Sequence, residues 1–152
     1  MVIRRFTPDD RQAYLGLAAA FYADGDAVDH PVPAHHAART FDALMAGTPY
    51  ADAFLAEEGG APLGFILLAI TWSNEAGGLT VWVEELLTLP QARGKGVGRA
   101  LLDQAREAYP GANRFRLEVT RDNARAIRLY ESIGYKPLPY DQMILDFPPP
   151  AP

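Results

Sequence analysis

A glycine-rich, basic turn with the sequence RGKGVGR occupies residues 93–99. Its cations are Arg93, Lys95 and Arg99, and its alternating glycines are Gly94, Gly96 and Gly98. Glycines allow backbone N–H groups to approach a ligand without intervening side chains. The apolar periodicity that follows predicts a helix, whose N-terminus favours anions. The pattern therefore predicts a turn that binds phosphate.

Two common phosphate-binding motifs do not fit this turn. The Walker pattern requires Lys followed by Ser or Thr after its second glycine, whereas Val97 and Gly98 follow Gly96. The dinucleotide fingerprint requires glycines at offsets zero, two and five, and neither Gly94 nor Gly96 begins such a series. Glu118 lies 20 residues after Gly98, where a ribose-binding acid would stand, so a dinucleotide-binding protein stays open as an alternative.

Two adjacent acids, Glu84 and Glu85, interrupt the apolar run VWVEELL. A carboxylate near the end of a strand can act as a general base. Adjacent strand residues face opposite sides of a sheet unless a bulge intervenes, so we expect at most one of them to face the reacting group. The competing interpretation is that both are solvated charges at the edge of the sheet.

A helical pattern over residues 123–135 places Tyr130 on the same face as Ile127 and Ile133. A phenol can protonate a leaving group, but a tyrosine on an apolar helix face can equally be a core residue. Asn123 begins this helix and is suited to be its N-cap.

The elements that position these residues follow from periodicity and turn signals. Strands are predicted at 2–6, 54–57, 63–72, 79–89, 115–119 and 142–147, and helices at 8–22, 37–46, 97–109 and 123–135. The order β-α-α-β-β-β-α-β-α-β predicts a mixed α/β sheet with helices on both faces and a parallel pair formed by the strands at 79–89 and 115–119. We expect one domain over residues 1–147 and a frayed, proline-rich tail at 148–152.

Composition excludes several classes of protein. The chain has 152 residues, a net charge of −5 and no cysteine, which argues against a nucleic-acid binder and excludes disulfides and thiolate metal sites. No apolar stretch approaches the ~20 residues of a membrane span, and the N-terminus does not resemble a signal peptide, so we expect a cytoplasmic protein without a membrane partner. His30, His35 and His36 lack the spacing of a metal site, so no metal is expected.

Two segments, EELLTLPQARGKGVGRALL (84–102) and LEVTRDNARAIRLYESIGYKP (117–137), resemble motifs A and B of the GNAT superfamily of N-acetyltransferases. Arg93, Gly96 and Gly98 match the core of motif A, and the Asn, Leu-Tyr-Glu and Gly-Tyr elements match motif B. The predicted order of elements agrees with the fold of that family. The resemblance therefore implies a GNAT fold and acetyl-coenzyme A as the acetyl donor.

The resemblance also assigns residues to the coenzyme. The amides from Gly94 to Arg99 would hold its pyrophosphate, and the strand end at residues 87–89 would pair with its pantetheine, splayed from the next strand. The residues so assigned are Leu87, Thr88, Leu89, Arg93, Gly94, Lys95, Gly96, Val97, Gly98, Arg99, Asn123 and Tyr130.

The chemistry implied by the resemblance is acetylation of an amine. An alkylamine with a pKa of about 10.4 is protonated at neutral pH and must lose a proton before it attacks. A similarity to the polyamine acetyltransferases favours Glu84 as the base, with Glu85 holding the amine or a neighbouring strand. Tyr130 would protonate the departing thiolate.

The acceptor pocket is expected near residues 21–40, where Tyr22, Asp26 and His30, together with Glu84, would bind the substrate. The alternative, to which we give equal weight, is that this segment is a solvent-exposed acidic loop that binds no substrate. We predict direct transfer of acetyl to a primary amine of a small molecule, such as a polyamine, an amino acid or an aminated metabolite, by a homodimeric enzyme. The alternatives are a protein N-acetyltransferase and a non-catalytic module that binds acyl-coenzyme A.

Overall fold

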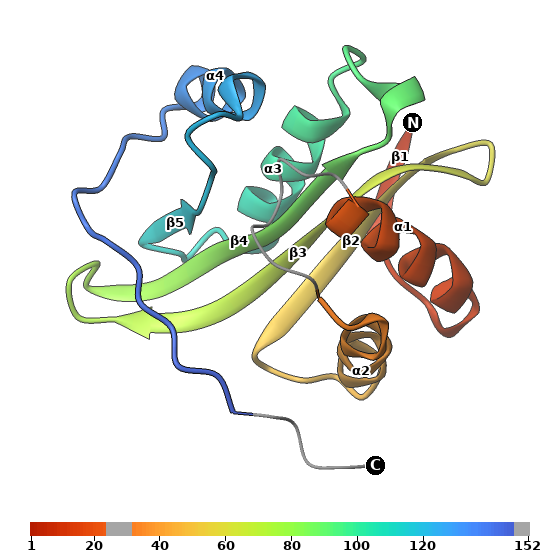
Figure 1. Cartoon of the computed structure of the whole chain (residues 1–152), viewed down its shortest axis with the longest axis horizontal. Coiled ribbons are helices and arrows are strands. Elements are labelled where there is room, and N and C mark those ends of the chain that lie inside the picture. Colours follow the sequence, from red (N-terminus) through yellow and green to blue (C-terminus); the bar gives the residue numbers. More distant parts are fainter. Residues whose placement is uncertain (24–31, 148–152) are drawn as a thin grey trace.

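The computed structural model describes residues 1–23 and 32–147 (Figure 1). Its centre is a five-stranded sheet with the order β1-β2-β3-β4-β5. The strands are β1 (Val2–Arg5), β2 (Ala51–Glu58), β3 (Ala61–Ser73), β4 (Gly78–Thr88) and β5 (Arg114–Leu117). Neighbouring strands are antiparallel except β4 and β5, which form the predicted parallel pair. The mixed sheet confirms the predicted fold class.

Four α-helices and two short 3-10 turns accompany the sheet. The helices are α1 (Arg11–Ala23), α2 (Ala34–Met45), α3 (Val97–Ala108) and α4 (Ala124–Ile133), and the turns are η1 (Pro8–Asp10) and η2 (Pro90–Ala92). The predicted first helix thus begins with the separate turn η1. Helix α4 ends at Gly134, whose positive φ of 106° suits a glycine after a helix.

The two faces of the sheet carry separate apolar cores, because strand side chains alternate between faces. Helix α3 covers one face, and helices α1 and α2 cover the other (Figure 1). The core under α3 includes Ile66, Val81 and Leu101, which are fully buried. The core under α1 includes Tyr14 and Phe65, whose rings make an edge contact at 5.8 Å. Helices therefore lie on both faces, as predicted.

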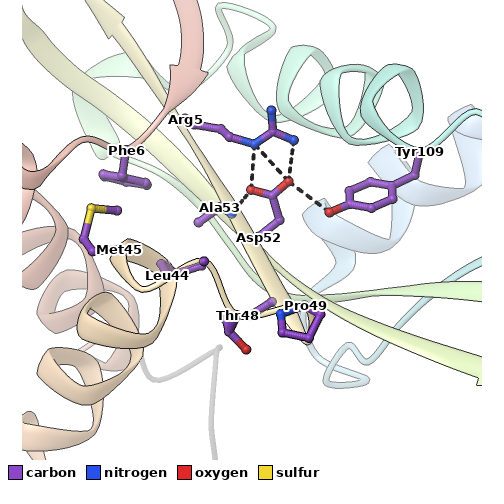
Figure 2. A pocket seen from close by; sticks show the side chains of 11 residues that line it. Arg5, Phe6, Leu44, Met45, Thr48, Pro49, Asp52, Ala53 and Tyr109 are labelled. Carbon is purple, nitrogen blue, oxygen red and sulfur yellow. Dashed lines mark hydrogen bonds and ion pairs between the residues drawn. The ribbon is translucent and has the colours of Figure 1, made fainter.

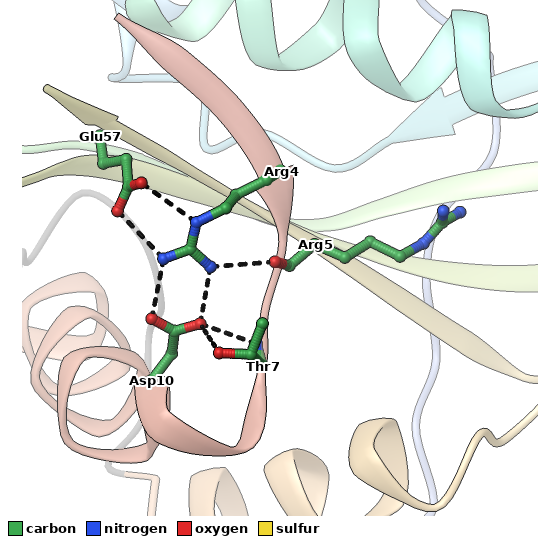
Figure 3. Close-up of polar contacts among 5 residues, drawn as sticks. All are labelled: Arg4, Arg5, Thr7, Asp10 and Glu57. Atoms are coloured by element: carbon green, nitrogen blue, oxygen red, sulfur yellow. Dashed lines mark hydrogen bonds and ion pairs between the residues drawn. The ribbon is translucent and has the colours of Figure 1, made fainter. Parts of the chain in front are cut away.

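A partly buried ion-pair cluster holds β1 against η1 and β2 (Figure 3). The Arg4 guanidinium donates to both carboxylate oxygens of Asp10, at 2.7 and 2.9 Å, and to both of Glu57, at 3.1 and 3.0 Å. The amide and hydroxyl of Thr7 also donate to Asp10. Asp10 therefore joins the edge strand to the start of the helical layer, and the donors of Arg4 and Thr7 hold the pKa of its carboxyl well below its usual range.

The prediction of a last strand at residues 142–147 is wrong. The structure gives this segment no regular secondary structure, and Met143, Ile144, Leu145 and Phe147 are exposed, Met143 by 95%. The short β5 is the last strand of the sheet, and nothing pairs with its outer edge among the described residues. A short apolar run becomes a strand only when it pairs with a neighbouring strand, and residues 142–147 pair with none of the described strands.

Candidate functional site

The parallel strands β4 and β5 separate halfway along β4. Their pairing runs from Thr80 with Arg114 to Val83 with Leu117 and stops there. Beyond this point a cleft of about 1500 Å³ opens, lined by the second half of β4, the segment after β5, and helix α4. The splaying that the family resemblance implied is therefore present, and it leaves the end of β4 without a strand neighbour on that side.

A β-bulge in β4 lies at the mouth of the cleft. Leu67 pairs with Glu85 and Leu68 pairs with Val83, so Glu84 is the extra residue. The bulge reverses the alternation of the strand: Val83 packs in the core under α3, whereas Leu87 packs in the core under α1. Glu84 and Glu85 consequently both lie on the α1 face, and the expectation that at most one of them faces the site is wrong.

Glu85 is the more buried of the two acids, with only 8% of its surface exposed. The Tyr22 hydroxyl, from the last turn of α1, donates a hydrogen bond to Oε1 of Glu85, while Oε2 has no hydrogen-bond partner. Burial, opposed by the hydrogen bond from Tyr22 and aided by the charge of Glu84, raises the pKa of Glu85 to about 7. Glu85 can therefore exchange a proton near neutral pH.

Glu84 lies at the surface of the cleft, beside Glu118. Glu118 follows β5 directly, one position beyond the last pair of Val83 with Leu117, and so stands opposite Glu84. Partial desolvation in the cleft, followed by the charge of Glu118, raises the pKa of Glu84. Sequence reasoning considered Glu118 only as a ribose-binding acid, because its place beside Glu84 depends on strand register.

The predicted phosphate turn forms the N-terminus of α3. Gly96 is the N-cap, with φ of 79°, and the first intrahelical bond runs from the Ala100 amide to the Gly96 carbonyl. The amides that precede this bond have no intrahelical acceptor, which suits an anion. Gly98 lies where a Cβ would approach Leu129 of α4 at 3.3 Å, so a glycine lets α4 pack closely beside the turn.

The structure brings only part of the predicted coenzyme set into the cleft. Its lining includes Leu87, Thr88, Arg93, Gly98, Asn123 and Tyr130. It does not include Leu89, Gly94, Lys95, Gly96, Val97 or Arg99. Val97 is buried, and Arg99 donates to Ser132 Oγ at 2.7 Å, so these two side chains hold α3 in place. Binding of a coenzyme by the backbone amides of Val97 and Arg99 stays a prediction.

Helix α4 places Tyr130 and Asn123 on the cleft. Asn123 is the N-cap of α4, and its Oδ1 accepts a hydrogen bond from the Ala126 amide at 3.0 Å. The ring of Tyr130 lies 5.8 Å from that of Tyr135. Burial, followed by Tyr135, raises the pKa of Tyr130 to about 12, so its phenol keeps its proton at neutral pH and can serve as an acid.

Of the predicted acceptor residues, Tyr22 and Glu84 lie on the cleft, whereas Asp26 and His30 fall outside the described residues. Phe21 lines the cleft beside Tyr22, and its ring makes an edge contact with the Tyr22 ring at 5.1 Å. Phe21 begins the stretch in which the sequence predicted the acceptor pocket, but it was not among the residues predicted to bind the substrate.

A second, smaller cavity of about 300 Å³ lies between β1, β2 and the end of α2 (Figure 2). Figure 2 shows Asp52 between Arg5 and Tyr109, with Phe6 and Met45 across the cavity. Asp52 accepts from Nε and Nη2 of Arg5 and, at 2.9 Å, from both the Tyr109 hydroxyl and the Ala53 amide. These contacts occupy the carboxylate of Asp52 and join the end of α3 to β2. We therefore assign Asp52 a structural role.

Two searches of residues 1–23 and 32–147 gave negative results. No group of three or more His, Asp or Glu side chains in these ranges could hold a metal ion. No helix in them is long and apolar enough to cross a membrane.

Residues 17–135 match the model of the Acetyltransferase (GNAT) family. A mycothiol acetyltransferase from Kineococcus radiotolerans is 35% identical over 142 residues, which are 89% of this chain and 42% of that protein. A mouse thialysine N-epsilon-acetyltransferase is 29% identical over 92 residues, which are 59% of this chain and 54% of that protein. The chain thus spans about half the length, or less, of these relatives.

Among solved structures, an integron cassette protein from the mobile metagenome of Cole Harbour Salt Marsh superposes with a TM-score of 0.79. It is 26% identical, and the match covers 97% of this chain and 91% of that one.

Proposed function

The chain belongs to the GNAT family of acetyltransferases, and we propose that it moves the acetyl group of acetyl-coenzyme A directly to a primary amine of a small molecule. The observation that carries the proposal is the opening between β4 and β5. It exposes Glu85, the start of α3 and Tyr130 to one cleft. The small-molecule acceptor is supported by relatives named for mycothiol and for thialysine.

The cleft offers a fitting place for the coenzyme. The uncapped start of α3 supplies backbone amides suited to a pyrophosphate. The end of β4, at Leu87 and Thr88, has no strand partner on its cleft side, so a strand-like pantetheine can pair with it. Arg93 joins these two parts, because its Nε donates to the Thr88 carbonyl at 3.3 Å.

Glu85 is the residue that we propose as the base. The resemblance favoured Glu84, but Glu85 combines a pKa of about 7 with an oxygen, Oε2, that has no partner. An ammonium substrate would give one proton to Glu85, and its nitrogen would then attack the acetyl carbon. Tyr22 would hold the other oxygen, Oε1, and so fix the orientation of the carboxylate.

Tyr130 is the residue that we propose as the acid. As the new C–N bond forms and the C–S bond breaks, the sulfur leaves with the electron pair of that bond. The Tyr130 phenol keeps its proton at neutral pH and would transfer it to the sulfur. The nitrogen loses a second proton as the C–N bond forms, and this proton would pass through solvent to the Tyr130 phenolate. Glu85 would release the first proton to solvent, so both side chains return to their starting states.

The test is an acetylation assay with acetyl-coenzyme A and a panel of amines, peptides with free N-termini and lysine peptides. We expect release of free thiol that depends on a small amine and yields its N-acetyl product. Acetylation confined to the peptides would favour a protein N-acetyltransferase. Coenzyme binding without turnover would favour a binding module, and preferential binding of NAD would favour a dinucleotide-binding protein. A homodimer, a cytoplasmic location and a single domain over residues 1–147 stay predictions.

A further inference from the structure

Three carboxylates gather where β4 and β5 separate. The bulge puts Glu84 and Glu85 on one face of β4, and the register of β5 puts Glu118 opposite Glu84. All three line the cleft. The charge of Glu118 acts on Glu84 and raises its pKa, so a cation that occupied this site would relieve the repulsion between them.

No basic side chain of the protein neutralises this group in the described part of the chain. The nearest cation on the same face of β5 is Arg116, and its guanidinium lies 3.8 Å from the centre of the Trp82 ring. Neither Glu84 nor Glu118 forms an ion pair with a described residue. The charge therefore remains available to a ligand.

Glu85 gives a second indication that this site takes a ligand with a hydrogen-bond donor. The residue is more than nine-tenths buried, and its Oε2 has no hydrogen-bond partner among the described residues. A buried carboxylate oxygen without a donor costs free energy, which a ligand N–H would recover. The unpaired Oε2 of Glu85 is buried, whereas Glu84 and Glu118 are exposed at the surface of the cleft.

The spacing of the carboxylates separates two kinds of cationic ligand. The three acids do not converge closely enough to hold a metal ion. Glu85 is buried on β4, whereas Glu118 is exposed just after the end of β5, beyond the last paired position, so the two carboxylates hold separate places along the cleft. This separation suits a ligand with two ammonium groups on an aliphatic chain better than a single compact ion.

Resting on the proposed acetyl transfer, we infer that Glu118 is a specificity-determining residue that selects a diamine as the acceptor. One ammonium group of the diamine lies at Glu85 and is acetylated after it loses a proton. The other lies between Glu84 and Glu118 and stays charged. A monoamine makes only the first contact, and an amino acid of the same length brings its carboxylate against the two acids.

The test compares three acceptors with the same four-carbon chain: 1,4-diaminobutane, n-butylamine and 4-aminobutanoate. With the wild-type protein, we expect kcat/KM to be about tenfold higher for the diamine than for the monoamine, and lowest for the amino acid. In Glu118→Gln the advantage of the diamine over n-butylamine should fall to about twofold. Glu107→Gln, an exposed acid on α3 outside the cleft, removes the same charge and should leave the ranking unaltered.

A binding measurement without acetyl-coenzyme A gives a readout that does not depend on turnover. The melting temperature of the wild-type protein should rise more with 1,4-diaminobutane than with n-butylamine, and Glu118→Gln should lose this difference. Equal kcat/KM for diamine and monoamine in the wild type, or an undiminished tenfold preference in Glu118→Gln, would overturn the inference while leaving the acetyltransferase proposal in place. Absence of acetylation with every amine, together with coenzyme binding, would instead contradict the proposed function.

Discussion

The hydroxyl of Tyr22 donates a hydrogen bond to Oε1 of Glu85, across 63 positions of sequence. The bond joins the last turn of α1 to the bulge of β4 and leaves Oε2 without a protein partner. It therefore connects the helical layer, which covers one face of the sheet, to the carboxylate that we propose as the base. Three of the predictions below concern this bond, its carboxylate and the acid on α4.

Tyr22→Phe should shift the pH dependence of kcat/KM to higher pH. The Tyr22 hydrogen bond lowers the pKa of Glu85, so its loss raises that pKa above about 7 and delays the ionisation that the base requires. The rate at alkaline pH should recover much of its wild-type value. Tyr50→Phe, at an exposed tyrosine outside the cleft, is the control. A uniform loss of rate without a shift would indicate a merely structural role for Tyr22.

Glu85→Gln should change how stability depends on pH. Because the folded pKa of about 7 lies above the ordinary value of 4.5, the folded chain keeps a proton that the unfolded chain releases between these values. The free energy of unfolding of the wild type therefore falls as pH rises through this window, by roughly 3 kcal/mol.

The variant cannot ionise at this position and should be more stable than the wild type at about pH 8 but similar to it at about pH 4. Chemical denaturation at both pH values measures the difference, with Glu107→Gln as the control. A difference of equal size at both pH values would contradict the raised pKa.

Tyr130→Phe should slow turnover and leave coenzyme binding almost intact. The phenol is the proposed proton donor to sulfur, and general acids contribute about 100-fold or more to rate. We expect kcat to fall by that factor and the dissociation constant of coenzyme A, measured calorimetrically, to change less than about twofold. Tyr135→Phe, whose ring contacts that of Tyr130, should retain most activity. Loss of coenzyme binding in Tyr130→Phe would assign this tyrosine to packing.

Gly64→Ala should destabilise the fold beside the site. Gly64 pairs with Thr88, and a Cβ at this position would lie 2.1 Å from the Leu87 carbonyl oxygen. The strands β3 and β4 would have to separate, at a cost of about 1–3 kcal/mol. Thermal unfolding should show this loss, whereas Gly16→Ala in α1, where a Cβ meets nothing within 4 Å, should be neutral or stabilising. Equal melting temperatures for the two variants would contradict the close approach.

Asp10→Asn should lower the free energy of unfolding at neutral pH by about 1–3 kcal/mol, because Arg4 and Thr7 lose a charged acceptor. The pKa of Asp10 is depressed in the folded chain, so its contribution is present above the ordinary value of 3.8 and is lost as pH falls below it. The difference between variant and wild type should therefore shrink in acid, as denaturation at several pH values would show. Asp103→Asn, which breaks an exposed pair with Arg106, should have little effect.

Local patterns were sufficient where the structure depends on neighbours in sequence. The glycine turn, the start of α3 and the N-cap Asn123 were all predicted, because helix ends are specified by the few residues around them. The strands predicted at 54–57, 63–72 and 79–89 followed for the same reason, since turn residues and apolar patterns are local signals. The failed strand at 142–147 shows the limit, because pairing with another strand depends on residues that are distant in sequence.

What the sequence by itself determined is therefore the family, the order of elements up to α4 and the glycine turn at the start of α3, each carried by contiguous residues. Only the tertiary structure decided the arrangement of the acids. The bulge that puts Glu84 and Glu85 on one face arises from the pairing of β3 with β4, and the place of Glu118 arises from the register of β4 with β5. Strand pairing and helix docking join residues that are distant in sequence, so neither these positions nor the Tyr22 contact with Glu85 could be deduced from any single segment.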